Sequence, residues 1–127
     1  MIVVDASAAL AALVNNGPAR QALSVEQLHA PHLIDSEVAS GLRRLVSSGR
    51  LDEADGLAAL DAWRGLAVTR YPVHPLLDRV WELRHNVSAY DAGYIALAEA
   101  LRCALVTADA RLGRAGGPRC SITLVPR

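Results

Sequence analysis

The chain has 127 residues, of which 52% are hydrophobic, so one domain with a sizeable core is expected and a disordered chain is excluded. Its 13 basic and 13 acidic residues give a formal net charge of zero, so no overall basic field attracts nucleic acid, and any such site must be local. All of the basic residues are Arg. A GC-rich genome would explain that bias, and Arg also suits bidentate contacts with phosphate or carboxylate groups.

Short apolar runs alternate with segments of helical periodicity along the whole chain. The runs predict β-strands at residues 2–4, 28–30, 67–71, 104–107 and 122–125. The segments between them predict helices at residues 6–14, from 18, at 31–47, 51–66, 75–86 and 88–101, and a short one from 109. Pro18 and Pro31 stand at predicted helix starts, where proline is tolerated.

The alternation of strands and helices predicts the fold class. Helical crossovers between strands produce a mostly parallel sheet that is covered by helices on both faces. We therefore expect a single α/β domain over residues 1–127, built in three layers. Functional sites in such sheets form at the carboxyl ends of strands, and Asp5 and Asp109 each follow a predicted strand directly.

Two further acids occupy predicted helix faces that are otherwise apolar. Glu37 shares a face with Ile34 and Val38, and Asp91 shares one with Tyr94. Both faces are predicted to point toward the core. Since carboxylates are rarely buried unless they are paired or bind a metal, these two residues are candidates for a functional site.

Each acid alone also has a simpler explanation. Asp5 suits the cap of the helix that follows it, and Asp109 suits a turn or a cap. Ser88 and Asp91 have the spacing of a capping box. Glu37 alone would be an ordinary solvated or Arg-paired acid of a helix. The four acids together, in the order strand end, helix, helix start and strand end, favour a cation site.

Four segments of the chain resemble the four motifs of PIN domains. They are Val3-Val4-Asp5-Ala6-Ser7, the mid-helix Glu37, Tyr90-Asp91-Ala92 with its Ala-rich helix, and Leu105-Val106-Thr107-Ala108-Asp109. The resemblance covers essentially the whole chain, whose size, start and end also resemble the VapC toxins of bacterial toxin–antitoxin pairs. It implies a three-layer PIN-like fold and a metal-dependent endoribonuclease that hydrolyses phosphodiester bonds of transfer or ribosomal RNA. It also implies a homodimer and inhibition by a small VapB-type antitoxin.

The resemblance implies a site in which Asp5, Glu37, Asp91 and Asp109 are catalytic and bind metal. Converging carboxylates repel one another, and a hard divalent cation relieves that repulsion, so we expect Mg²⁺, with Mn²⁺ as the alternative. Asp5 and Asp91 are the expected primary ligands. Glu37 and Asp109 would bind through water, complete a second metal site or orient the attacking water.

By the same resemblance, Ser7 and Thr107 offer supporting hydroxyls, although a local backbone hydrogen bond would explain either one. The chain departs from the family at one place. Many relatives carry a further acid just beyond the fourth motif, where Ala110 and Arg111 stand here, and this argues against a complete second metal site.

Two rival classes lack residues that they need. A phosphoacceptor signalling domain would use a Lys, which this chain does not have, and a haloacid-dehalogenase-like phosphatase would need an Asp where Ser7 stands. The alternative that remains is a catalytically inactive PIN-like module that binds RNA or protein.

Other segments bear on partners and location. Arg43-Arg44 and Arg84-His85 are candidates for contact with RNA or with an antitoxin carboxylate, or else belong to solvated faces. The helices have more apolar positions than one small core needs, which predicts a homodimer and a separate apolar groove for an antitoxin segment. No long apolar stretch predicts a membrane span and no signal peptide is recognised, so we expect a cytoplasmic protein.

Overall fold

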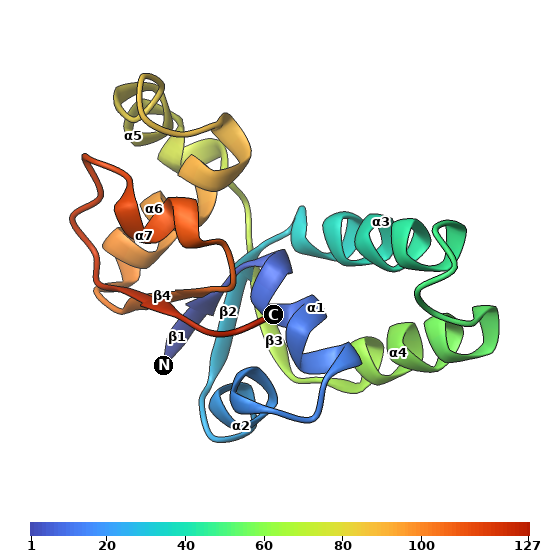
Figure 1. Ribbon diagram of the computed structural model, residues 1–127. Helices are drawn as coiled ribbons and strands as arrows, with labels where there is room; N and C mark the ends of the chain where they lie inside the picture. Colours follow the sequence, from blue (N-terminus) through green and yellow to red (C-terminus); the bar gives the residue numbers. More distant parts are fainter.

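A five-stranded, entirely parallel sheet forms the centre of the protein, whose computed structural model describes all 127 residues (Figure 1). The strands lie in the order β3-β2-β1-β4-β5, so β1 is central and pairs with both β2 and β4. Their bounds are β1 (Ile2–Val4), β2 (Leu28–Pro31), β3 (Val68–Tyr71), β4 (Ala104–Thr107) and β5 (Ile122–Leu124). The predicted α/β fold class is confirmed.

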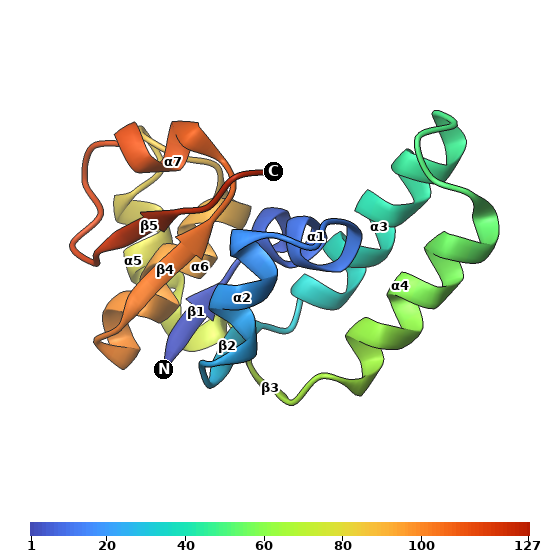
Figure 2. The same cartoon turned by 60° about the horizontal axis from the view of Figure 1, so that its bottom comes forward.

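Helices cover both faces of this sheet, as the alternation of elements predicts. Helices α1 to α4 lie on one side and α5 and α6 on the other, and α6 packs directly against β1, β2 and β4 (Figures 1 and 2). The pair α3 and α4 extends away from the sheet (Figure 2). The bounds are α1 (Ala6–Val14), α2 (Pro18–Ser24), α3 (Ile34–Ser47), α4 (Glu53–Gly65), α5 (Leu77–Glu82), α6 (Ala89–Leu101) and α7 (Ala110–Arg114).

Small side chains bring the helices close to the sheet and to one another. In α1, Ala8 and Ala9 are fully buried. Gly41 of α3 faces Leu10 of α1 so closely that a Cβ atom at Gly41 would lie 2.3 Å from Leu10 Cδ1. Because any side chain at this position would have to displace Leu10, the glycine sets how closely α3 approaches α1. The first turn of α3 carries Glu37.

An ion pair fixes the start of α3. Arg70 of β3 donates to both carboxylate oxygens of Asp35, with Nε 2.6 Å from Oδ2 and Nη2 2.8 Å from Oδ1. The indole Nε1 of the buried Trp63, in α4, donates to Oδ1 over 2.8 Å. Three elements are thereby joined two residues before Glu37, so the position of that side chain depends on this cluster.

The structure differs from the sequence prediction at several boundaries. Pro31 does not start a helix but ends β2, opposite Tyr71 of β3. This is possible because β1 pairs with β2 only at Leu28 and His29, so the missing N–H of Pro31 removes no bond to β1.

The helix predicted at residues 75–86 is also broken. A 3₁₀ turn at His74–Leu76 leads into α5, which ends at Glu82, and the predicted helix at 51–66 begins only at Glu53. None of the helices has both the length and the apolarity needed to cross a membrane.

Candidate active site

The four acids singled out in the sequence line a single groove of about 660 Å³. Asp5 follows β1 and caps α1, whereas Asp109 follows β4 and caps α7. Glu37 and Asp91 lie in the first turns of α3 and α6. Because β1 and β4 are parallel neighbours, their carboxyl ends meet at this edge of the sheet, and the groove forms where sites in such sheets are expected.

Asp5 is the most buried of the four, with 4% of its surface exposed. Its Oδ1 accepts hydrogen bonds from the Ala8 backbone N–H over 2.9 Å and from Ser7 Oγ over 2.7 Å, and its Oδ2 accepts one from Thr107 Oγ1. The two hydroxyls proposed as supporting groups therefore contact Asp5 directly. Burial raises the pKa of Asp5, and these hydrogen bonds oppose the increase.

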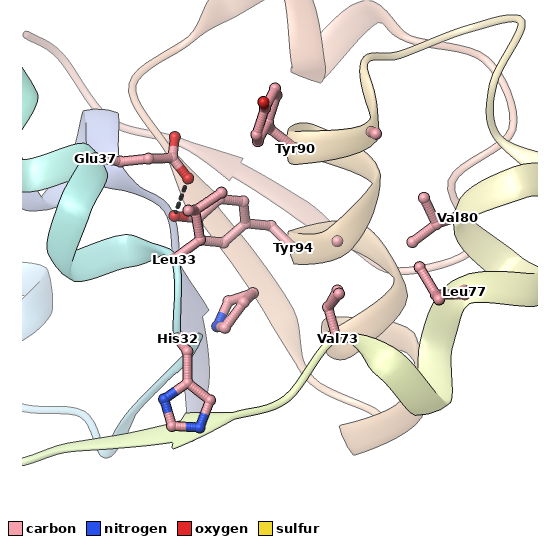
Figure 3. A pocket seen from close by; sticks show the side chains of 11 residues that line it. His32, Leu33, Glu37, Val73, Leu77, Val80, Tyr90 and Tyr94 are labelled. Atoms are coloured by element: carbon pink, nitrogen blue, oxygen red, sulfur yellow. Dashed lines mark hydrogen bonds between the residues drawn. The ribbon is translucent and has the colours of Figure 1, made fainter.

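Glu37 is held by Tyr94, a residue that sequence reasoning placed on the helix face of Asp91 without giving it a role. The Tyr94 hydroxyl donates to Glu37 Oε1 over 2.8 Å, and the ring is 1% exposed (Figure 3). A buried tyrosine needs a partner for its O–H, so the sequence could have indicated that Tyr94 has an acceptor, although not which residue it is. Burial raises the pKa of Glu37, and the charges of Asp91 and Asp5 raise it further.

Asp91 lies in the first turn of α6, and its backbone N–H donates to Oγ of the N-cap residue Ser88 over 3.2 Å. The predicted cap is thus present, yet the Asp91 side chain also lines the groove. Burial raises the pKa of Asp91 and Asp109 adds to this, whereas Ser88 and Arg111 oppose it. The capping and functional explanations of Asp91 are therefore compatible.

Asp109 differs from the other three acids. Arg111 donates to both of its carboxylate oxygens, with Nε 3.1 Å from Oδ1 and Nη2 2.7 Å from Oδ2. This guanidinium lowers the pKa of Asp109. In the sequence, Arg111 stands out only as a departure from the pattern of the relatives. Its pairing with Asp109 was not predicted.

Arginines complete the rim of the groove. Arg44, Arg50, Arg111 and Arg127 line it together with the four acids. Of the adjacent pair Arg43-Arg44, only Arg44 lies there, since Arg43 borders a different hollow between α3 and α4. Arg84 lies over the ring of Trp81, 4.5 Å from its centroid. The neutral chain therefore concentrates charges of both signs at one place.

The acids suit a hard cation by their chemistry. Asp5, Glu37 and Asp91 carry only oxygen donors, take part in none of the salt bridges, and have raised pKa values because they are withdrawn from water and face one another. No three His, Cys, Asp or Glu side chains are arranged closely enough to hold an ion as they stand. The hydrogen bonds of Asp5 and the pairing of Asp109 with Arg111 direct these carboxylates to protein donors instead.

Comparisons with known proteins show which family the chain belongs to. The model of the PIN domain family matches residues 2–118. Ribonuclease VapC9 of Mycobacterium tuberculosis is 67% identical over 127 residues, which span all of both chains, and ribonuclease VapC1 of the same species is 47% identical over 97% of this chain and 96% of its own.

Solved structures share the fold. PAE2754 from Pyrobaculum aerophilum superposes with a TM-score of 0.71 at 27% identity, covering 95% of this chain and 81% of its own. VapBC2 from Rickettsia felis, solved bound to a DNA fragment from its promoter, gives 0.66 at 15% identity over 97% of this chain and 98% of that one. At that identity the second likeness concerns the fold alone.

The raised pKa of Asp91 leads to a prediction about stability. A carboxyl whose folded pKa is raised penalises the folded state at neutral pH, and the penalty vanishes below its ordinary value of 3.8, where the wild type is protonated in both states. We expect Asp91→Asn to raise the melting temperature at pH 7 by only about 1 to 2 °C, because the side chain is half-buried and solvent screens part of the penalty. The gain should disappear as the pH falls to about 3.8.

Thermal unfolding followed by circular dichroism at several pH values measures this difference. The matched control is Asp55→Asn, which removes an exposed acid from the first turn of α4 and so changes the helix terminus in the same way. An Asp91→Asn protein that melts no higher than the control at pH 7 would contradict the electrostatic description of the groove.

Proposed function

Because this chain belongs to the PIN domain family and is a ribonuclease toxin of the VapC type, we propose that it cleaves RNA with Mg²⁺ held by the acids of the groove. The observation that supports this most strongly is the set of three carboxylates from three different elements, of which Asp5 is buried and the other two are half-buried, and none of which forms a salt bridge. Such a set is unfavourable in a protein unless a cation or substrate chemistry uses it.

We assign Asp5 and Asp91 to the cation, with Glu37 and Asp109 as further acids of the catalytic set. The chemistry that Mg²⁺ or Mn²⁺ supplies when bound is charge neutralisation on the phosphate and acidification of a water molecule. Asp5 is kept in place by Ser7, Ala8 and Thr107, so its orientation does not depend on the cation.

Glu37 is the proposed general base. Tyr94 occupies one carboxylate oxygen, Oε1, and leaves Oε2 to accept a proton from the attacking water. Its raised pKa makes it a better proton acceptor than an exposed Glu, because the charged form is less stable there. Tyr94 therefore acts as a positioning residue for this carboxylate.

The arginines of the rim are the proposed contacts to the RNA backbone. Arg44 and Arg50 lie at the α3 end of the groove, whereas Asp5 and Asp109 lie at the carboxyl ends of the strands. Backbone phosphates of an RNA on one side of the cleaved bond would therefore reach these two arginines. The family resemblance makes a transfer or ribosomal RNA the proposed target. A cytoplasmic location follows from such a target, and cell fractionation checks it.

The proposed protein partner is a VapB-type antitoxin. The acidic part of the groove continues into an apolar part between α1 and α3, lined by Leu10, Ala11, Val14 and Leu45. An antitoxin segment with apolar side chains would occupy this part, and a basic side chain would then reach the acids. Copurification with the product of a small neighbouring reading frame, and its loss in a Val14→Asp variant, tests this assignment.

A second copy of the chain is the proposed occupant of another apolar surface. A cavity of about 320 Å³ opens beside α5 and α6, and most of its walls are apolar (Figure 3). Leu33, Val73, Leu77 and Tyr90 line it although each is 37% to 65% exposed. Exposed apolar side chains gathered around one cavity are typical of an interface, and a homodimer would cover them.

The first functional prediction concerns cleavage. We expect the purified protein to cut RNA with Mg²⁺ or Mn²⁺ and not with a chelator, and we expect Glu37→Gln to lower the rate by about 100-fold or more, since a general base contributes this much. Tyr94→Phe should lower it less, because Glu37 remains. End-sequencing of the products measures both the rate and the site.

Circular dichroism checks that the Glu37→Gln protein is folded, which we expect because Gln keeps an acceptor for Tyr94. The Arg43→Ala protein, altered on the same helix outside the groove, should cleave like the wild type. Full activity of folded Glu37→Gln would remove this residue from the mechanism.

The second functional prediction separates two adjacent arginines. If Arg44 contacts a phosphate and Arg43 does not, Arg44→Ala should weaken binding to an uncleaved RNA. The plot of log affinity against log salt concentration should also become less steep, by about 0.7 in slope, which is the contribution of one phosphate contact on a single strand. Fluorescence anisotropy of labelled RNA with Asp91→Asn protein gives the slope. Equal slopes for the Arg43→Ala and Arg44→Ala variants would refute the proposed RNA path.

The third functional prediction concerns assembly. Leu77→Arg places a charge on a 49% exposed side chain at the cavity, and it should convert a dimer to a monomer without unfolding the chain. Sedimentation at micromolar concentration measures the change. Leu57→Arg, on a 61% exposed apolar side chain of α4, is the matched control and should stay dimeric. A wild type that sediments as a monomer would rule out this assignment of the surface.

A further inference from the structure

Asp109 and Arg111 form a closed local unit at the turn between β4 and α7. The Asp109 carboxylate caps the helix by accepting the Arg111 backbone N–H on Oδ1 over 2.9 Å. The same oxygen accepts the Arg111 Nε, and Oδ2 accepts Nη2 over 2.7 Å. Both carboxylate oxygens of Asp109 therefore already accept hydrogen bonds from Arg111.

The pairing is uneven in exposure. The Asp109 side chain is 14% exposed, whereas the Arg111 side chain is 80% exposed and reaches in from solvent. A long, exposed side chain is held only weakly by such a contact, because water and salt compete with it. Arg111 is thus a counter-ion that can be displaced, unlike the buried Thr107 hydroxyl that holds Asp5.

Arg111 supplies positive charge at the acids where a divalent cation would bind. It lines the groove with the four acids, and its charge acts on Asp91 as well as on Asp109. The other three acids have no partner of this kind. One side chain of the chain itself therefore neutralises the part of the groove that the fourth acid occupies.

We propose that Arg111 is a positioning residue that competes with the divalent cation for Asp109. While Arg111 is paired with Asp109, the cation would be bound through Asp5 and Asp91, and Asp109 would join them only when Arg111 moves away. This inference rests on the proposed metal-dependent function. It makes the Arg111 side chain a determinant of how tightly the groove binds a divalent cation.

The test is a double-mutant cycle read out by Mn²⁺ binding rather than by cleavage. Isothermal titration of the folded full chain compares the wild type with Arg111→Ala, Asp109→Asn and the double variant. Removing the competitor should tighten Mn²⁺ binding about fivefold, the factor that corresponds to losing one exposed ion pair. In the Asp109→Asn background, Arg111→Ala should alter the Mn²⁺ affinity by no more than about twofold, because there is then no carboxylate at position 109 for which Arg111 and Mn²⁺ compete.

Arg114→Ala is the matched control, because it removes the same charge from the same helix at a side chain that forms no hydrogen bond or ion pair. Arg111→Gln provides a second variant if Arg111→Ala unfolds α7. Equal tightening with and without Asp109, or tightening by Arg114→Ala, would show a general charge effect and overturn the inference while keeping the cation site. Absence of Mn²⁺ binding to every variant would overturn both the site and the inference.

Discussion

The hydrogen bonds of the buried Asp5 carboxylate are the interactions on which the rest of the site depends. They join the end of β1, the first turn of α1 and the end of β4, through Ala8, Ser7 and Thr107. The register of the two central strands makes this possible, because Val4 lies beside Val106 and the Asp5 backbone N–H donates to the Val106 carbonyl oxygen over 3.1 Å. A shift of one residue would turn Thr107 to the opposite face of the sheet and leave the carboxylate without its donor.

The sequence could predict this part of the fold because the determinants are local. A short apolar run followed by an acid identifies a buried strand and its carboxyl end, and that pattern located both Asp5 and Asp109. Pro31 was placed wrongly for a physical reason. Proline is compatible with a helix start and also with the end of a strand where no neighbouring strand needs its N–H. The sequence does not show that β2 extends past its last pair with β1, so it could not distinguish the two.

Contacts between distant segments lay beyond sequence reasoning. The bond of Tyr94 to Glu37 joins residues 57 positions apart, and the segregation of Arg44 from Arg43 depends on how α3 packs against α1. Asp109 and Arg111 are close in sequence, but their side chains could pair with each other or with other groups. Which of these occurs depends on where α7 begins. Sequence reasoning therefore identified the acids, and the structure added the side chains that orient them.

The kinds of side chain that line the groove have a consequence for how it responds to acid. Its basic members are all arginines, whose guanidinium groups keep their charge at any pH that a cell experiences, and no histidine or cysteine lines it. Titration of the groove is therefore carried by carboxylates alone. Acidification can change its net charge in only one direction, toward positive, so protons would expel a divalent cation and strengthen the hold on a phosphate at the same time. Under the proposed function, metal binding would therefore weaken and RNA binding would strengthen as the pH falls.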